Sequence, residues 1–170
     1  NYTHSFSDRL AWSTTFNYTR GDGFYENYKA GKSFSKYLMP DPVVDGVVYD
    51  EGDFITKEAL ANDYFVLNSD LRYSSRRLNL TAGVNLSRYD GDHIGSVLWS
   101  DVLGDSFDYA GHQWYLNNGL KHEANAFVRA EWSPLAWMTA YADLQYRGVW
   151  LDMAGPEDDQ IPLDYSTDWQ

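Results

Sequence analysis

The sequence predicts an all-β chain: an antiparallel up-and-down meander that forms part of a transmembrane β-barrel with short periplasmic turns and long extracellular loops. Three observations predict this fold class. Apolar and polar residues alternate with period two in segments of about ten residues or longer, the length that a tilted strand needs to cross a hydrocarbon layer. The connections between these segments are alternately short and long, so a meander places every short turn at one end. Aromatic residues close the apolar rows at both ends, as in the girdles of outer-membrane barrels.

The composition argues against several function classes. The 170 residues carry a formal net charge of −12, whereas the phosphates of nucleic acids need a basic protein surface. The chain has no cysteine, which removes disulfides and thiol chemistry. No run approaches the roughly 18 apolar residues of a membrane-spanning helix, but barrel strands turn only half of their residues towards lipid. Aromatic residues make up 17% of the chain, and Tyr and Trp suit ligand-facing surfaces and membrane interfaces alike.

The first part of the chain predicts a hairpin whose second arm is a full strand. Residues 1–6 have the pattern of a strand that begins upstream, and residues 7–9 form a turn. Apolar residues alternate with small or polar residues over residues 10–19. At residues 20–23 two glycines flank an aspartate, a combination that favours turn geometry, so the strand is expected to end there. Residues 21–62 are then expected to be a long, acidic and aromatic connection.

The middle of the chain repeats this arrangement. Residues 63–73 predict a strand, residues 74–77 a tight turn and residues 78–87 the returning strand. Residues 90–121 are expected to be the second long connection. Connections of this length are uncommon in compact soluble domains and ordinary on the external side of outer-membrane barrels.

The clearest hairpin covers residues 122–150. Its first arm, residues 122–132, places small apolar residues and Trp132 on one face and charged residues on the other, whereas a helix would mix the two sets. Ser133 and Pro134 begin a tight connection to the second arm. Residues 151–170 predict a third polar connection without a returning strand. Five complete strands and one partial strand cannot close in lipid, so residues 1–170 are expected to be one partial barrel domain.

Several short segments resemble the barrel region of TonB-dependent outer-membrane receptors. They are residues 2–10 (YTHSFSDRL), residues 18–26 (YTRGDGFYE), residues 62–64 (NDY), residues 89–95 (YDGDHIG) followed by Trp99, and residues 143–147 (DLQYR). The resemblance implies a barrel of about 22 strands in the outer membrane of a Gram-negative bacterium, of which about a quarter is present. It also implies a plug domain and a TonB box, neither of which is recognisable in this sequence.

The resemblance further implies the function and the partners. Such receptors import bulky nutrients with energy from the TonB complex. The ferric siderophore, haem, cobalamin, glycan and peptide classes all stay open as ligand; the frequency of iron transport in the family slightly favours an iron chelate such as a ferric siderophore, although no residue decides between the classes. The implied partners are outer-membrane lipid, the TonB complex, the receptor's own plug domain and the ligand. No cofactor is expected.

Two sets of residues are candidates for contact with a ligand or a transport path. Aromatic side chains in the long connections could capture a ligand or pack the connections against one another: Phe24, Tyr25, Tyr28, Tyr37, Trp99, Trp114 and Tyr115. Charged side chains on the polar face of the strands are expected to face the lumen, where they could line a transport path, contact a plug or pair across neighbouring strands: Arg72, Arg129, Glu131, Asp143 and Arg147.

A metal site is a weak candidate. Asp90, Asp92 and His93 lie close together in the sequence, and they are candidates because carboxylates and imidazoles are common metal ligands. Further acidic and imidazole side chains follow at Asp101, Asp105, Asp108 and His112. Their spacing matches neither a calcium loop nor a zinc-binding motif, so a turn-forming loop is the preferred interpretation and no metal is expected.

Two functions from other classes stay open. A secreted, soluble all-β carbohydrate-binding module would use the aromatic residues to stack on sugars, but it needs apolar faces packed on each other in a sandwich. A glycan-cleaving enzyme would need a defined carboxylate pair, and pairs such as Asp158 and Asp159 are too frequent in an acidic chain to indicate one. The nucleophile-elbow, phosphate-loop and dinucleotide motifs are missing, so the protein is expected not to be an enzyme.

Overall fold

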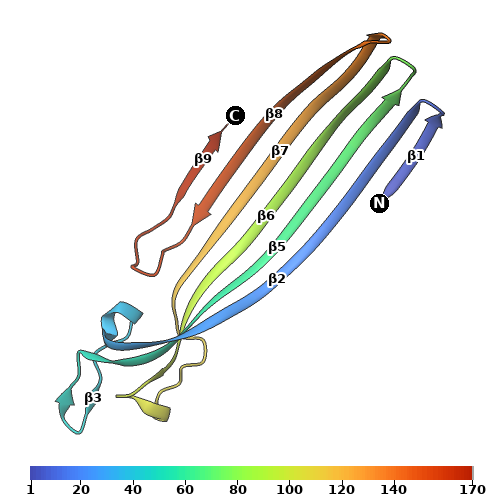
Figure 1. Cartoon of the computed structure of the whole chain (residues 1–170). Helices are drawn as coiled ribbons and strands as arrows, with labels where there is room; N and C mark the ends of the chain where they lie inside the picture. Colours follow the sequence, from blue (N-terminus) through green and yellow to red (C-terminus); the bar gives the residue numbers. More distant parts are fainter. Residues whose placement is uncertain (170) are drawn as a thin grey trace.

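Seven strands lie side by side in chain order in the computed structural model, which describes residues 1–169 (Figure 1). Each strand pairs antiparallel with the next, so the predicted all-β antiparallel meander is confirmed. The strands of this sheet are β1 (Tyr2–Ser7), β2 (Leu10–Ser33), β5 (Glu51–Ser74), β6 (Leu78–Ser100), β7 (Gln113–Leu135), β8 (Met138–Ala154) and β9 (Tyr165–Trp169).

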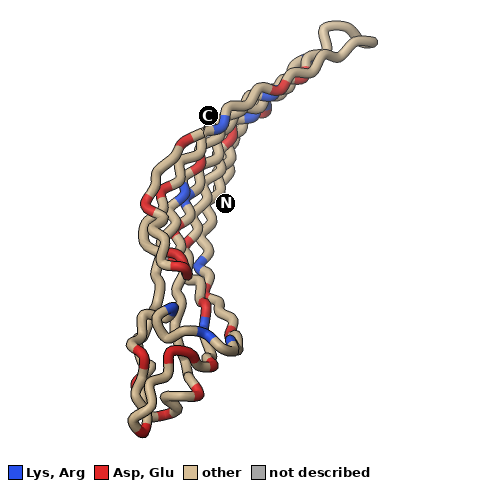
Figure 2. Tube along the Cα trace, turned by 90° about the vertical axis from the view of Figure 1, so that its left-hand side faces the viewer, with Lys and Arg blue, Asp and Glu red and all other residues tan. Residues whose placement is uncertain are grey.

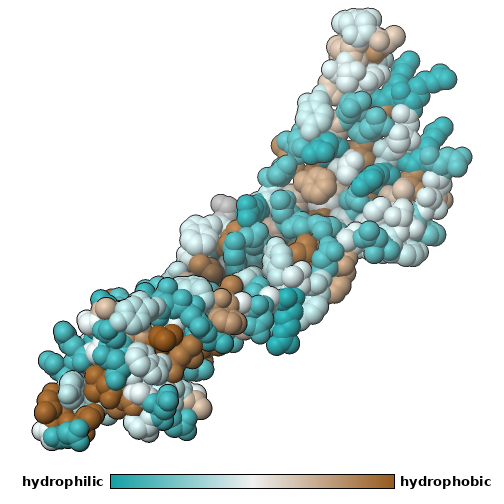
Figure 3. All heavy atoms as spheres, turned by 60° about the horizontal axis from the view of Figure 1, so that its bottom comes forward, coloured by the Kyte–Doolittle hydropathy of each residue, from teal (hydrophilic) through white to brown (hydrophobic). Residues whose placement is uncertain are grey.

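Smaller elements occupy the connections at one end of the sheet. They are the 3-10 helices η1 (Phe34–Tyr37) and η2 (Gly104–Ser106), and the hairpin of β3 (Val43–Val44) and β4 (Val47–Val48). The hairpin exposes its valines, and apolar side chains gather at this end of the molecule in Figure 3. None of the helices in the described part of the chain is long and apolar enough to cross a membrane.

The strands are much longer than predicted, which corrects the expected long connections. β2 continues from Thr19 to Ser33 and β5 begins at Glu51, with Gly21 opposite Asn62 and Gly23 opposite Leu60. Neither glycine forms a turn, because the backbone ladder continues past the point where the apolar alternation stops. Pairing satisfies the backbone hydrogen bonds whatever the polarity of the side chains, so the end of the alternation did not mark the end of the strand.

The same correction applies to the other long connections. β6 continues to Ser100 and β7 begins at Gln113, so the second connection shrinks to residues 101–112. After β8 the chain does return: β9 pairs with β8 from Val149 opposite Trp169 to Met153 opposite Tyr165. The prediction that no strand follows residue 150 was therefore wrong. Below, the end of the sheet that carries residues 34–50, 101–112 and 155–164 is called the long-loop end.

The opposite, short-turn end agrees with the predicted turns at two of three places. Residues 8–9 and 75–77 join their strands as expected. The third turn lies at residues 136–137, because Ser133 and Pro134 stay within β7. The register with β8 shifts between Trp132 and Leu135, and such an irregularity tolerates a proline that has no N–H to donate.

The register places the predicted apolar rows on one face of the sheet, called here the apolar face. Leu71 pairs with Ala82, Ala82 with Val128 and Val128 with Leu144, so one apolar line crosses four strands. The described residues provide no second layer over this face (Figures 1 and 2). Leu144 is accordingly 75% exposed. A soluble sandwich would instead bury these rows.

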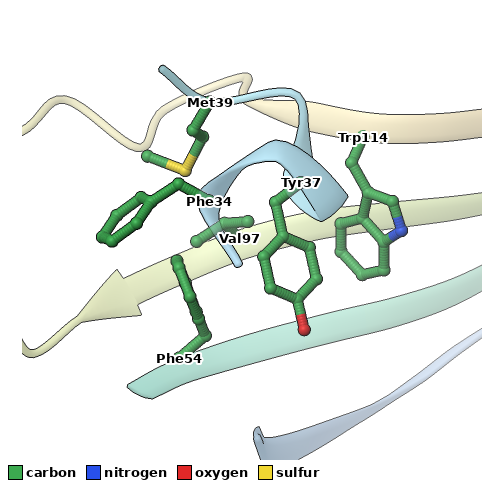
Figure 4. Packing of buried hydrophobic residues seen from close by; sticks show 6 residues of the cluster. All are labelled: Phe34, Tyr37, Met39, Phe54, Val97 and Trp114. Carbon is green, nitrogen blue, oxygen red and sulfur yellow. The ribbon is translucent and has the colours of Figure 1, made fainter. Parts of the chain in front are cut away.

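The buried core lies at the long-loop end, where η1 and the residues after it pack on the ends of β5, β6 and β7 (Figure 4). Its members are Phe34, Tyr37, Met39, Phe54, Val97 and Trp114. Phe54 lies an even number of residues from Asp70 and Arg72 on the uninterrupted strand β5, so the cluster packs on the side of the sheet that carries the charged rows. This side is called the polar face. The helix η1 therefore covers part of the polar face beyond the apolar rows.

Candidate functional site

The candidate site is an open groove of about 620 Å³ on the polar face at the long-loop end. Strands β2, β5, β6 and β7 supply its floor, and the connection after β8 supplies one wall. Its lining residues are Gly23, Phe24, Tyr25, Glu58, Ala59, Leu60, His93, Tyr115, Asn117, Glu157 and Asp158.

One line of the sheet register assembles the floor of the groove. Tyr25 lies opposite Glu58, Glu58 opposite Gly95, and Gly95 opposite Tyr115. The Tyr25 hydroxyl donates a hydrogen bond to the Glu58 carboxylate. Gly95 leaves room for the neighbouring ring, because a Cβ at this position would lie 2.2 Å from Cε1 of Tyr115. The two tyrosines thus stand in the same row with a carboxylate and a glycine between them.

The connection from residue 155 to residue 164 forms the wall. The Asn117 Nδ2 donates to the carbonyl oxygen of Pro156 at 3.1 Å, and Gln160 Nε2 donates to the carbonyl oxygen of Trp114 at 2.5 Å. Gly155 makes the approach possible, because it has a φ of 96° and a Cβ there would lie 2.4 Å from the Leu116 carbonyl oxygen. These contacts bring Glu157 and Asp158 to the groove.

The electrostatics of the groove are acidic. Burial raises the pKa of the Tyr115 phenol to about 12, and the Glu58 and Asp158 carboxylates add to this shift. Burial first, then the same two carboxylates, also raises the pKa of Tyr37. The hydrogen bond to Glu58 is the largest cause of the raised pKa of Tyr25. All three phenols therefore stay neutral at physiological pH, and the charged side chains that line the groove are carboxylates.

The structure divides the seven aromatic candidates among three environments. Tyr25 and Tyr115 direct their side chains into the groove, whereas Phe24 borders it but, as the neighbour of Tyr25 in an extended strand, turns its ring to the opposite face. Tyr37 and Trp114 are buried in the core, with their ring centroids 5.1 Å apart and edge to face. The other two candidates lie outside both places, Tyr28 beside Asp53 and Trp99 opposite Ile55.

Sequence reasoning missed most of the polar groove residues. Glu58, Asn117, Glu157 and Asp158 come from three separate parts of the chain, and no local pattern distinguishes them from the other acidic and amide side chains. The strand register could have found Glu58, because it lies opposite Tyr25.

Tyr28 and Asp53 form a separate hydrogen-bonded pair at the long-loop end. The Tyr28 hydroxyl donates to the Asp53 carboxylate, and the Gly31 N–H donates to the same carboxylate at 2.9 Å. Both bonds hold the pKa of Asp53 below its ordinary value of 3.8, the phenol more strongly than the amide. Asp53 also donates its own N–H to the Asp101 carboxylate at 2.8 Å.

A pH dependence follows from the Tyr28 and Asp53 pair. Since the folded pKa of Asp53 is depressed, its contribution to stability is complete above the unfolded pKa of about 4 and is lost as the pH falls through the lower folded pKa. Removing the phenol in Tyr28→Phe should move this loss to higher pH. Hydrogen exchange of residues 28–34, corrected for the intrinsic rate, measures it between about pH 3 and pH 6. Coinciding pH profiles of Tyr28→Phe and the parent chain would contradict the role of the phenol.

Most of the candidate lumen-facing charges are paired on the polar face. Arg129 lies opposite Asp143 with its guanidinium 3.1 Å from the carboxylate, and Arg147 lies 2.9 Å from Glu123. Arg72 contacts Asp70 on its own strand at 2.6 Å. Glu131 is exposed and lies between Asn79 and Tyr141 in the register. Water screens ion pairs as exposed as these, so they contribute little to stability and indicate a hydrated face.

The metal candidates do not converge. Asp90 and Asp92 share the Asn118 amide as a donor, at 2.9 and 2.8 Å. His93 turns to the opposite face, because it follows Asp92 in an extended strand, and it lines the groove. Within residues 1–169 no group of three or more acidic or imidazole side chains is arranged to hold a metal ion.

No protein-family model matches the sequence, and none of the curated proteins matches it either. The geometry of the sheet and of the groove therefore carries the functional assignment.

Proposed function

We propose that the chain is part of an outer-membrane transport receptor: a section of a large β-barrel that imports a bulky nutrient with energy from the TonB complex. One observation carries the proposal. The described residues form a single-layered sheet. Its apolar rows have no covering layer within residues 1–169, and its other face carries paired charges and amides. In a barrel wall, acyl chains cover the first face and the aqueous bore hydrates the second.

The stagger of the short turns supports a barrel wall. The register line through Leu10, Tyr73, Leu80 and Ala130 lies one residue from the turn at residues 8–9, three from the turn ending at Arg77 and six from the turn beginning at Ala136. The turns thus recede by five residues over four strand spacings. With a rise of about 3.3 Å and a spacing of about 4.8 Å, the strands tilt by about 40° from the perpendicular to the line of turns, within the range of membrane barrels.

The aromatic residues support the same placement. Trp12, Tyr73 and Trp132 stand towards the short-turn end of the apolar rows, and Phe65 and Trp150 stand towards the other end. Beyond the second set, Arg20, Asp63 and Asp90 share one register line on the apolar face. A change from apolar through aromatic to charged side chains matches the passage from hydrocarbon through the interface to water.

The position of the groove supports transport. It lies on the polar face beyond the apolar rows, so a ligand held there stands at the external entrance of the bore. The core on η1 covers a neighbouring part of the same face and narrows this entrance. The coupling to TonB rests on the resemblance of residues 18–26 and 89–95 to the receptor family.

Cysteine scanning of the receptor in outer-membrane vesicles tests the placement in lipid. Residues 1–170 have no cysteine, so single substitutions give unique labels in a receptor in which any cysteine elsewhere has been replaced by serine. A spin label on Val84→Cys or Val128→Cys should be relaxed by oxygen dissolved in lipid, and one on Asn85→Cys or Arg129→Cys by a water-soluble nickel chelate. Loss of this alternation, or nickel access to the apolar face, would overturn the placement.

Nutrient uptake tests the transport function. A strain without the gene and a strain without TonB are compared on the same panel of labelled nutrients. We expect both strains to lose accumulation of at least one bulky nutrient. A plasmid copy of the gene should restore this uptake in the gene deletion and should not restore it in a strain that lacks TonB. Unchanged uptake across the panel in the gene deletion would contradict the proposal.

A further inference from the structure

The groove offers an excess of negative charge. Glu58, Glu157 and Asp158 supply carboxylates, and among its described lining residues His93 is the one basic side chain. Lys36 approaches Asp158 at 3.5 Å, but the two side chains are 40% and 58% exposed, so water screens the pair. The Glu58 carboxylate accepts one bond from Tyr25 and keeps lone pairs for further donors.

A buried acceptor without a donor lies in the same groove. Asn117 lines it and is 4% exposed. Its Nδ2 donates to the Pro156 carbonyl oxygen. This bond fixes the orientation of the amide and leaves Oδ1 as the group that still needs a donor. Oδ1 has no hydrogen-bond partner among the described residues. Buried acceptors in this condition are unfavourable, and a donor on a bound ligand would satisfy this one.

Two aromatic rings complete the arrangement. The Phe24 ring lies on the opposite face of the sheet, where Lys57 Nζ is 4.1 Å from its centroid. Tyr25 and Tyr115 remain as rings whose faces can attract a cation from a ligand, and Glu58 lies between them in the register. Their phenols are neutral, so these rings offer their faces and the carboxylates offer the charge.

We infer that the groove binds a positively charged, amine-bearing part of the transported ligand. Ammonium donors fit Glu58, Asp158 and the free Asn117 Oδ1, and the carbon atoms next to the ammonium lie against Tyr25 and Tyr115. An anionic chelate would meet three like charges. A neutral glycan would gain no charge attraction and would offer acceptors as well as donors. The physiological meaning of the inference rests on the proposed transport function; the binding chemistry does not.

Calorimetry on the detergent-purified receptor tests the inference at neutral pH and low salt. The probes are end-blocked trilysine, tri-(N-acetyl-lysine) as the neutral peptide of equal length, triglutamate, and the trimer of N-acetylglucosamine. We expect trilysine to bind at least tenfold more tightly than either neutral probe and triglutamate not to bind. The preference should shrink with added salt, because screening weakens exposed charges. Equal affinities across the probes, tighter binding of the glycan trimer, or no binding of trilysine would overturn the inference.

Variants of the groove locate the effect. Glu58→Gln and Asp158→Asn each remove one charge and should weaken trilysine binding threefold to tenfold, and Asn117→Leu removes the free acceptor and should weaken it as well. Asp45→Asn is the matched control, because it removes one exposed carboxylate at the β3–β4 turn outside the groove, and asparagine tolerates the positive φ of 54° there. Equal losses of trilysine affinity in Asp45→Asn and Glu58→Gln would mean that the overall negative charge of the protein attracts the probe, and this result would overturn the site. The spin-label alternation is independent of these results, so failure of the cation site and failure of the membrane placement are distinguishable.

Discussion

Leu144→Arg is expected to destabilise the proposed barrel in lipid by about 2–4 kcal/mol, because the proposal places this side chain on the lipid face near the middle of the bilayer, where an arginine has this cost. Leu144 lies halfway along the apolar row of β8 between Met138 and Trp150, and it is 75% exposed. No described side chain could pair with the new charge across the apolar line that runs through Val128 and Ala82. Reversible denaturation of the receptor in lipid vesicles measures the change in the free energy of unfolding.

The neighbouring residue supplies the control. Gln145 points to the polar face, next to the Arg129 and Asp143 pair, so Gln145→Arg should change the free energy of unfolding by about 0.5 kcal/mol or less. The contrast between two adjacent positions identifies lipid as the cause. In a water-soluble protein a leucine with this exposure would accept arginine at almost no cost. Equal effects of the two substitutions would therefore contradict the membrane placement.

The apolar rows could be predicted from the sequence because their signal is local. Alternation along residues 78–87 and 122–132 defines a face within each strand. The tight turn at residues 75–77 brings the apolar rows of β5 and β6 into register. The extent of the strands could not be predicted in this way. Beyond Thr19 and Tyr89 the side chains lose the alternation, and only pairing with a neighbouring strand keeps the backbone extended.

The groove depends on contacts that the sequence pattern does not carry. Tyr25 and Tyr115 were both candidates, but their position in one groove depends on the register through β5 and β6, which lie between them. The wall depends on the return of β9, which sets the course of the connection that carries Asp158. Tyr37 and Trp114 were candidates of the same kind and instead became core, because η1 folds over β5 and β6. An aromatic residue in a long connection therefore indicates packing as readily as ligand binding.

Phe54→Ala is expected to cost about 3–5 kcal/mol, the usual effect of removing a phenylalanine ring from a closed core. Phe54 is fully buried, and its ring centroid lies 5.0 Å from that of Phe34 and 4.6 Å from that of Tyr37 (Figure 4). The cluster stands beyond the apolar rows, so the loss should fall on the long-loop end. Hydrogen exchange should accelerate in residues 34–50 and 101–112 and stay unchanged in the apolar rows of β5 to β8.

Phe24→Ala is the matched control for this loss, because the Phe24 ring is largely exposed and its removal leaves no cavity. It should leave the exchange of both connections close to that of the parent chain. The comparison separates two sources of order in the connection of residues 34–50. If residues 34–50 stay protected in Phe54→Ala, the His112 Nε2 contact with the Tyr37 carbonyl oxygen at 2.7 Å and the β3–β4 hairpin hold η1 without the core. If protection is lost, side-chain burial in the six-residue core holds η1 over the polar face.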